Sequence, residues 1–362
     1  MTFGGVSIVI WLKRAGWLLA ALIACVVVVL LDFMRHGGQF RTLKPHTPGI
    51  CSPVPLTASA EDIQIDRARG IAYLSLLDRR AGMQGVETQG DLYALDLNTE
   101  PLQGNSALAR VPPGFHPHGL SLYRVGDGSL RLFAISHPKG QPHAVEIFEQ
   151  GTEGGFRPVA TITDPALRSP NAVAAIGARQ FYVANDSGAR NIWQRFGELV
   201  LRRGLSEVLY FDGETMRVVA HGLKSATGIA VSGDGLRVYV SETLGRRVRV
   251  YERNAGTGEL TPLEDIDLAS APDNLNFDAD GNLWIAAHPK TFELVRHFIS
   301  AKHPSPTQIF RWSPNAVGVP RLEEVLLDDG RALSAGSVGA VVGRRLFVGS
   351  ITEKKLLSCR LP

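Results

Sequence analysis

The chain has 362 residues, of which 44% are hydrophobic and 20% charged, and its formal net charge at pH 7 is +3. This composition excludes a disordered chain, and three cysteines are too few for a small disulfide-stapled scaffold. The near-neutral charge balance gives no sign of a nucleic-acid-binding surface. We therefore expect a globular body that buries one large core or two ordinary ones.

The N-terminus contains an apolar segment, AGWLLAALIACVVVVLL, which extends from Ala15 to Leu31. Its length is at the lower limit for a membrane-spanning helix, which needs about 20 apolar residues. Because no small-residue cleavage site follows, we interpret residues 1–36 as an uncleaved signal anchor in the membrane; a cleaved signal peptide and a secreted protein are the alternative. Residues 37–50 combine glycines, prolines and mixed charges without a hydrophobic period, which predicts a linker.

One pattern recurs from residue 51 to residue 362, in which a turn with Gly or Asp precedes a short apolar strand. The copies read ARGIAYLSLLD (68–78), GDGSLRLFAISHP (126–138), GARQFYVANDSG (177–188), GDGLRVYVSET (233–243), DADGNLWIAAHP (278–289) and GRRLFVGSIT (343–352). Many short strands with closely spaced turn signals indicate an all-β architecture. Recurrence at roughly 45–60 residues is typical of propeller blades. We predict an all-β, six-bladed β-propeller over residues 51–362.

Two cysteines lie at the two ends of the predicted propeller, Cys51 and Cys359, while Cys25 is a small hydrophobic residue within the apolar segment. Their positions suggest a disulfide that joins the first and last blade segments, and two unrelated thiols are the alternative. If bonded, they close a loop of about 300 residues, for which the chain-entropy model gives on the order of 5 kcal/mol. Such a bond implies an oxidising, extracytoplasmic compartment.

Polar residues recur at blade-like intervals just before apolar strands. Glu61, Asn171, Asp273 and Asn274 are the members that we expect to converge on the propeller axis. Carboxylate and amide oxygens are the donors of a hard cation, which points to Ca²⁺. The alternative is that each is a turn former bonded to its own backbone. The chain has neither the Cys/His spacing of a zinc site nor a Gly-x-Ser-x-Gly motif.

Characteristic segments follow one another along the chain: HPHGLSL (116–122), AISHP (134–138), YVANDS (182–187), TGIAVSGDGLRVYVSE (227–242), VYE (250–252), DNLNFDADGNLWIAAHP (273–289) and the terminal cysteine pair. Together they resemble the paraoxonase/arylesterase family over about residues 45–362, and the chain is similar in fold to gluconolactonase-like and strictosidine-synthase-like propellers. The resemblance implies a six-bladed propeller, two axial calcium ions, hydrolysis of lactones and aryl esters, and a retained hydrophobic N-terminus.

The resemblance implies that oxygen-bearing side chains hold the catalytic calcium: Glu61, Asn171, Thr227, Asp273 and Asn274. Thr227 stands where the family has an asparagine, and its hydroxyl is a shorter, neutral ligand. The second, structural ion resembles a site formed by Asp62, the backbone of Leu120 and an aspartate that is Ala172 here. The missing carboxylate argues against this second ion, so we expect one catalytic calcium, and two ions are the alternative.

Two histidines, His118 and His137, match the family's proposed catalytic dyad. Asp186 matches an acidic residue associated with the second histidine, and His288 matches a histidine of the active-site wall. Because imidazole titrates near neutral pH, His118 is expected to take a proton from water while His137 relays it. A metal-bound carboxylate, Asp273 or Glu61, is the alternative base.

Three functions fit the sequence. The first is a calcium-dependent lactonase or arylesterase that hydrolyses a small-molecule ester or lactone, which the pair His118 and His137 favours. The second is a sugar lactonase or strictosidine-synthase-like enzyme on the same fold. The third is a non-catalytic, ligand-binding propeller. Thr227 and Ala172 are consistent with it, because a protein that has lost its catalytic activity is expected to have lost some of its metal ligands as well.

Two segments are expected to wall the pocket, the loop Asn191–Arg203 and the segment Lys290–His303, which contains the best helix candidate of the propeller region. Both are rich in aromatic, aliphatic and basic side chains, which suits an apolar ester or lactone with some anionic character. Trp193, Phe196 and Phe292 are the expected wall residues, and ordinary loop packing is the alternative.

Overall fold

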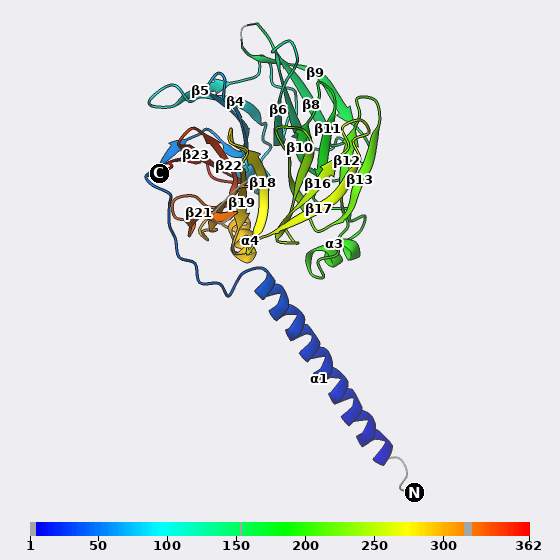
Figure 1. The fold of residues 1–362 in the computed structure, drawn as a ribbon. Helices are drawn as coiled ribbons and strands as arrows, with labels where there is room; N and C mark the ends of the chain where they lie inside the picture. Colours follow the sequence, from blue (N-terminus) through cyan, green and yellow to red (C-terminus); the bar gives the residue numbers. More distant parts are fainter. Residues whose placement is uncertain (1–4, 153, 315–320) are drawn as a thin grey trace.

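The computed structural model describes residues 5–152, 154–314 and 321–362. Within these residues the strands form six four-stranded antiparallel sheets around a common axis, with one long helix projecting from the ring (Figure 1). The innermost strand of each sheet packs beside the innermost strands of the two neighbouring sheets. This arrangement confirms the predicted all-β, six-bladed β-propeller.

The first three blades follow the chain, each from its innermost to its outermost strand. Blade 1 comprises β2 (Ser59–Asp66), β3 (Ile71–Leu77), β4 (Asp91–Asp96) and β5 (Gln103–Ser106); blade 2 comprises β6 (Pro117–Arg124), β7 (Leu130–Ser136), β8 (Ala144–Gln150) and β9 (Phe156–Thr163); blade 3 comprises β10 (Pro170–Ala175), β11 (Phe181–Asn185), β12 (Ser206–Phe211) and β13 (Met216–Leu223).

The other three blades continue in the same way, except that the last takes one strand from the beginning of the chain. Blade 4 comprises β14 (Ala226–Val231), β15 (Arg237–Glu242), β16 (Arg247–Arg253) and β17 (Leu260–Asp267); blade 5 comprises β18 (Ala271–Phe277), β19 (Leu283–His288), β20 (Thr307–Trp312) and β21 (Leu322–Asp328); blade 6 comprises β22 (Gly336–Val342), β23 (Arg345–Ser350), β24 (Lys355–Arg360) and β1 (Cys51–Pro55).

Aromatic side chains on the second strand of each blade fill the space between neighbouring sheets. These residues are at most 1% exposed: Tyr73, Phe133, Tyr182, Tyr239, Trp284 and Phe347. A large ring in the middle of a strand buries more apolar area than any other residue type can. The recurring apolar runs of the sequence are therefore the second strands, and their aromatic residues pack the blades together.

The ring closes through the two ends of the chain. Strand β1 pairs antiparallel with β24, which places Cys51 directly opposite Cys359, and the two cysteines form a disulfide. The predicted bond is thus confirmed, although both cysteines lie within blade 6 and do not link two different blades.

Four helices accompany the strands in the described residues: α1 (Gly5–His36), α2 (Arg79–Met83), α3 (Ile192–Leu199) and α4 (Thr291–Ile299). Helices α2, α3 and α4 each connect the second strand of a blade to its third, and α2 and α4 follow closely on β3 and β19. Because second strands run antiparallel to first strands, these helices lie at the end of the propeller where the innermost strands begin. This end is called the mouth below.

Helix α3 occupies a segment for which the sequence predicts a loop. Asn191 caps it by accepting a hydrogen bond from the backbone N–H of Gln194 at 3.0 Å. An asparagine N-cap satisfies one of the amide groups that the first helical turn leaves unpaired. The prediction of a loop was wrong because it overlooked a local signal: Ile192, Phe196 and Leu199 recur at helical spacing directly after the cap.

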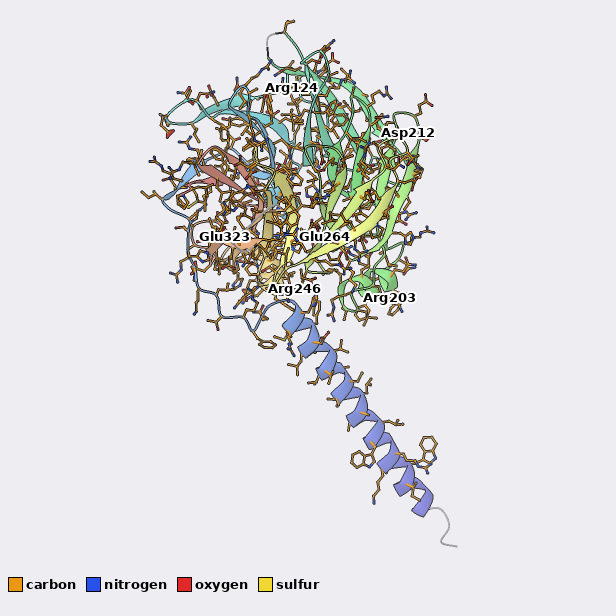
Figure 2. The ribbon with its side chains drawn as sticks, viewed as in Figure 1. Arg124, Arg203, Asp212, Arg246, Glu264 and Glu323 are labelled. Atoms are coloured by element: carbon orange, nitrogen blue, oxygen red, sulfur yellow. A yellow bond between two sulfur atoms is a disulfide. The ribbon has the colours of Figure 1, made fainter. Side chains whose placement is uncertain are left out.

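Helix α1 is apolar over most of its length, and the apolar residues far from the propeller are exposed in the described structure. In the described part of the chain it is the helix whose length and composition suit a bilayer. Its end is attached to the mouth, where Phe33 packs edge-to-face on Phe292 of α4 at 5.0 Å between ring centroids. Arg246, which is labelled near the end of α1 in Figure 2, donates a hydrogen bond to the His36 carbonyl at 2.7 Å. A Cβ on Gly38, which has φ +72°, would lie 2.0 Å from the Pro289 carbonyl, so the chain leaves α1 in close contact with blade 5.

Replacing both Cys51 and Cys359 with serine is expected to lower the free energy of unfolding by about 2–5 kcal/mol, because the bond restricts the unfolded chain. Denaturant unfolding of the full chain in mild detergent, followed by tryptophan fluorescence, measures the change. Cys25→Ser is the matched control, since Cys25 is free in the described structure and should leave stability unchanged. A double variant as stable as the parent would show that the β1–β24 ladder closes the ring unaided.

Candidate active site

Each innermost strand carries an irregularity at the same level, near the mouth. The register with the second strand shifts there in all six blades. The residues at the shifts are Glu61 and Asp62 on β2, His118 and Gly119 on β6, Asn171 on β10, Thr227 on β14, Asp273 and Asn274 on β18, and Ser337 on β22. A β-bulge bends the strand and re-aims the side chains of its extra residues. The bulges gather the predicted site residues around one level of the channel.

The bulged backbones approach each other very closely. A Cβ on Gly119 would lie 2.6 Å from the Ala172 Cα, and one on Gly228 would lie 2.3 Å from the Asp273 carbonyl oxygen. Such distances leave no room for a side chain, so glycine is required at both positions. Gly119 and Gly228 therefore allow neighbouring innermost strands to pack closely against each other.

Glu61 and Asn274 form the buried centre of this ring. The Asn274 amide donates to Glu61 Oε1 at 2.6 Å and to the Glu61 carbonyl at 3.2 Å. The Ser337 hydroxyl also donates to the Glu61 carbonyl, at 2.7 Å. Glu61 is only 1% exposed, yet its Oε2 has no hydrogen-bond partner among the described residues. A buried oxygen without a hydrogen-bond partner is costly, so Oε2 is well suited to accept a bond from an ion, a water molecule or a substrate.

The side-chain oxygen of Asn171 is the second oxygen of the ring that has no hydrogen-bond partner in the described structure. The Asn171 Nδ2 donates to Asp186 Oδ2 at 3.5 Å, whereas the buried Oδ1 is left without a partner there. Asp186 also accepts a short hydrogen bond from the Ser169 hydroxyl, and burial raises the pKa of Asp186. The expected association of Asp186 with the second histidine is not found: in the described residues no hydrogen bond joins Asp186 to His137. Asp186 instead orients the Asn171 amide.

The other polar side chains of the ring are tied to blades 4 and 5. His288 Nε2 lies 3.0 Å from Asp273 Oδ2, so this histidine holds a carboxylate and does not join the dyad. Thr227 Oγ1 lies 2.6 Å from Thr243 Oγ1, which itself donates to the Pro272 carbonyl at 2.7 Å. Thr227 Oγ1 also lies 3.3 Å from the Pro272 carbonyl, so either hydroxyl can donate to the other. In both arrangements the Thr227 oxygen keeps a lone pair for a ligand.

Asp62 is already satisfied by protein groups. Its Oδ1 accepts from the backbone N–H of Ile63 and its Oδ2 accepts from the backbone N–H of Leu120, both at 2.7 Å. The Leu120 amide thereby joins blade 2 to Asp62 of blade 1. Because Ala172 adds no side-chain oxygen, Asp62 is the one carboxylate among the residues expected for a second ion, which is a poor donor set for calcium.

The site concentrates buried carboxyl groups, whose charged forms have few compensating cations nearby. Burial raises the pKa of Glu61 well above its usual range, while the nearby Arg79 guanidinium opposes the shift and Asp273 adds to it. Burial likewise raises the pKa of Asp62 to about 7. Arg79, the first residue of α2, donates to the Pro117 carbonyl at 2.6 Å, and its Nη1 has no hydrogen-bond partner in the described residues. The carboxylates therefore lie in a place where a cation is strongly favoured.

The described residues contain no cluster of three or more His, Cys, Asp or Glu side chains that fits a metal ion. A cation at this level of the channel would therefore depend on amide and hydroxyl oxygens in addition to Glu61 and Asp273. Oxygen donors of mixed charge, with two of them unpartnered, suit a hard ion such as Ca²⁺.

The two motif histidines are in direct contact. His118 Nδ1 lies 3.0 Å from His137 Nε2, and the other nitrogen of His118 lies 3.6 Å from Glu61 Oε1. Burial, together with Arg79, lowers the pKa of His118 well below its usual range, and burial lowers the pKa of His137 to about 3. Both rings are therefore neutral at pH 7, and each keeps one nitrogen lone pair.

A pocket of about 810 Å³ opens beside the dyad and is lined by residues that include Arg79, His116 and His137. The channel continues past the bulges as a smaller cavity of about 210 Å³. The predicted wall residues are not among those that line this pocket: Trp193 and Phe196 are 81% and 53% exposed on α3, and Phe292 packs against Phe33 of α1.

Sequence reasoning missed three residues of this site. Ser337 is a serine in an apolar strand, and the feature that distinguishes it is the β-bulge between Gly336 and Val338, which the sequence does not show. Arg79 stands in a turn that carries no motif, and its approach to the carboxylates depends on the short helix α2. His143 lies 3.0 Å from His137 across a loop, and no spacing rule connects them.

Comparison with known proteins bears on this geometry. A family model described as Arylesterase matches residues 55–361. Serum paraoxonase/arylesterase 1 of Rattus norvegicus is 30% identical over 334 residues, which cover 90% of this chain and 93% of that protein. Serum paraoxonase/lactonase 3 of the same organism is 28% identical over 337 residues, with coverage of 90% and 93%.

Solved structures share the fold at much lower identity. A putative gluconolactonase has a TM-score of 0.53 at 17% identity, covering 88% of this chain and 97% of that chain. Regucalcin, a calcium-binding protein from Agrobacterium tumefaciens, has a TM-score of 0.52 at 14% identity, covering 88% and 95%. These likenesses show the propeller fold, whereas the family match and the curated relatives show that this chain belongs to the arylesterase family.

Proposed function

We propose that this protein is a calcium-dependent hydrolase of aryl esters and lactones. The observation that carries the proposal is the ring of buried oxygens at the bulges, where Glu61 Oε2 and Asn171 Oδ1 have no partner among the described residues and a neutral histidine pair lies alongside. The names of the curated relatives, paraoxonase/arylesterase and paraoxonase/lactonase, support the same substrate class.

The ion would be held by oxygen-bearing side chains of the ring: Glu61, Asn171, Thr227, Asp273 and Asn274. When bound, calcium would polarise the carbonyl of the ester and stabilise negative charge on its oxygen. The chain's own residues prepare this site in advance, because Asp186 orients the Asn171 amide and His288 holds Asp273. One ion is proposed, since Ala172 leaves the expected second site without one of its carboxylates.

His118 is the proposed general base. Its Nε2 faces the buried ring near Glu61, while its Nδ1 is engaged by His137. A water molecule beside Nε2 would lose its proton to this nitrogen as it attacks the ester carbonyl, and the proton would pass on to the leaving alcohol. His137 would orient His118 in this step. A carboxylate of Glu61 or Asp273 is the competing base.

We further propose that α1 anchors the protein in a membrane with the propeller in an extracytoplasmic compartment. The length and apolar composition of α1 support the anchor, and the Cys51–Cys359 disulfide supports an oxidising environment.

Removing calcium is expected to abolish hydrolysis of phenyl acetate and of simple aliphatic lactones, and adding calcium back should restore it. Bound calcium also stabilises the native state, by about 2.7 kcal/mol at one hundred times the Kd. Initial rates and thermal unfolding of the full chain, with and without chelator, measure both effects. Hydrolysis that persists after complete chelation would contradict the proposal, and a folded protein that binds calcium without turnover would favour the non-catalytic propeller.

Glu61→Gln is expected to lower kcat/KM by at least about 100-fold and to weaken calcium binding measured by titration calorimetry, because it removes a charged ligand oxygen. Asn276→Ala is the matched control. Asn276 lies on the same strand as Asn274 but beyond the bulge, where it bonds Gln64 and the Ile63 carbonyl. Equal calcium affinity in the Glu61 variant and the control would remove Glu61 from the ion site.

His118→Gln is expected to lower kcat by about 10²–10⁴-fold while leaving calcium affinity within about twofold, since the base is not a ligand. Single-turnover rates and calcium titration on one preparation separate the two effects. A variant that keeps the parental kcat would show that His118 is not the base and would favour a carboxylate in that role.

A further inference from the structure

A third imidazole extends the histidine pair. His143 places its Nδ1 3.0 Å from His137 Nδ1, and the two rings meet edge-to-face with 4.7 Å between centroids. The other nitrogen of His137 contacts His118, whose Nε2 faces Glu61. The three rings thus form a continuous hydrogen-bonded chain from the buried ring to the half-buried His143.

The backbone fixes this contact. Ser136 at the end of β7 pairs with Ala144 at the start of β8, so the residues just beyond this pair, His137 and His143, are neighbours across the strands. The loop between them reverses through Gly140, which has φ +72°. The meeting of the two rings is therefore a property of the hairpin and not of a flexible surface side chain.

The chain of contacts has only two possible hydrogen arrangements. A neutral imidazole has one N–H and one lone pair, so His137 donates to one neighbour and accepts from the other. If His137 donates to His143, it accepts from His118 Nδ1, and His118 Nε2 is left with its lone pair. If His143 donates to His137, the order reverses and His118 Nε2 carries the hydrogen, which makes it unable to act as a base.

We propose that His143 is a positioning residue for the hydrolytic site: its Nδ1 accepts a hydrogen bond from His137 and thereby holds His118 in the tautomer with the lone pair on Nε2. This inference rests on the proposed role of His118 as base. His143 takes the part that a carboxylate plays in a nucleophile–base–orienter arrangement, in which the third group sets the tautomer of the imidazole.

The kinetic test compares two substitutions of His143 in the full chain. His143→Leu removes the acceptor and is expected to lower kcat at least about tenfold with KM within about twofold, because only the base tautomer is affected. His143→Asn keeps an acceptor oxygen near the position of Nδ1 and should regain most of the loss. His221→Leu, an exposed histidine on outer strand β13, is the control and should match the parent. Equal impairment of the Leu and Asn variants, or an unimpaired Leu variant, would overturn the proposal.

A spectroscopic test separates this inference from the proposed function. Nitrogen-15 spectra of histidine-labelled protein, assigned with the single variants, report which nitrogen of each ring carries hydrogen. The expected pattern is hydrogen on His118 Nδ1 and on His137 Nδ1, with the preference lost in His143→Leu. Hydrogen on His118 Nε2 in the parent would overturn the proposal whether or not esters are hydrolysed. The expected pattern in a protein without esterase activity would support the tautomer chain and reject the proposed function.

Discussion

The candidate site depends on a repeated interruption of the backbone: every innermost strand breaks register with its neighbour at one level of the channel. A regular strand would alternate its side chains between the two faces of the blade, where they would pack against the next sheet. The bulge turns polar residues to the axis without exposing the apolar core behind them. The cost is crowding, which Gly119 and Gly228 relieve because no Cβ fits at either position.

Once the bulges have brought the carboxylates together, charge determines what the site needs. Glu61, Asp62 and Asp273 are all buried, and Arg79 is the nearby cation that acts on each of them. Asp62 obtains two backbone donors, whereas Glu61 keeps an unpartnered oxygen. The two adjacent acidic residues of one motif therefore have different roles: one joins blades, and the other remains available to a ligand.

The blades could be predicted because their signals are local: turns with Gly or Asp, each followed by a short apolar run, that recur along the chain. The converging residues could be predicted because the inner strands repeat. Contacts that depend on loop conformation could not. Asp186 follows a motif strand, but its carboxylate bonds Ser169 and Asn171, and no hydrogen bond in the described residues joins it to His137. His143 meets His137 only because the hairpin turns back at that residue, which no residue spacing encodes.

The pairing of β1 with β24 has a consequence for biosynthesis. Cys51 of β1 and Cys359 of β24 are separated by 308 residues in the sequence. During translation, the backbone groups of β1 therefore remain unpaired until β24 has been synthesised. Such an edge is a site for wrong pairing with another chain. Blade 6 is completed only when β24 has been synthesised and has paired with β1. Because the two cysteines face each other only in this pair, the Cys51–Cys359 disulfide forms after the ring has been assembled. A chain cut short before Lys355 would lose the closure of the ring, and with it the alignment of the bulges on blades 1 and 6 that meet at Glu61.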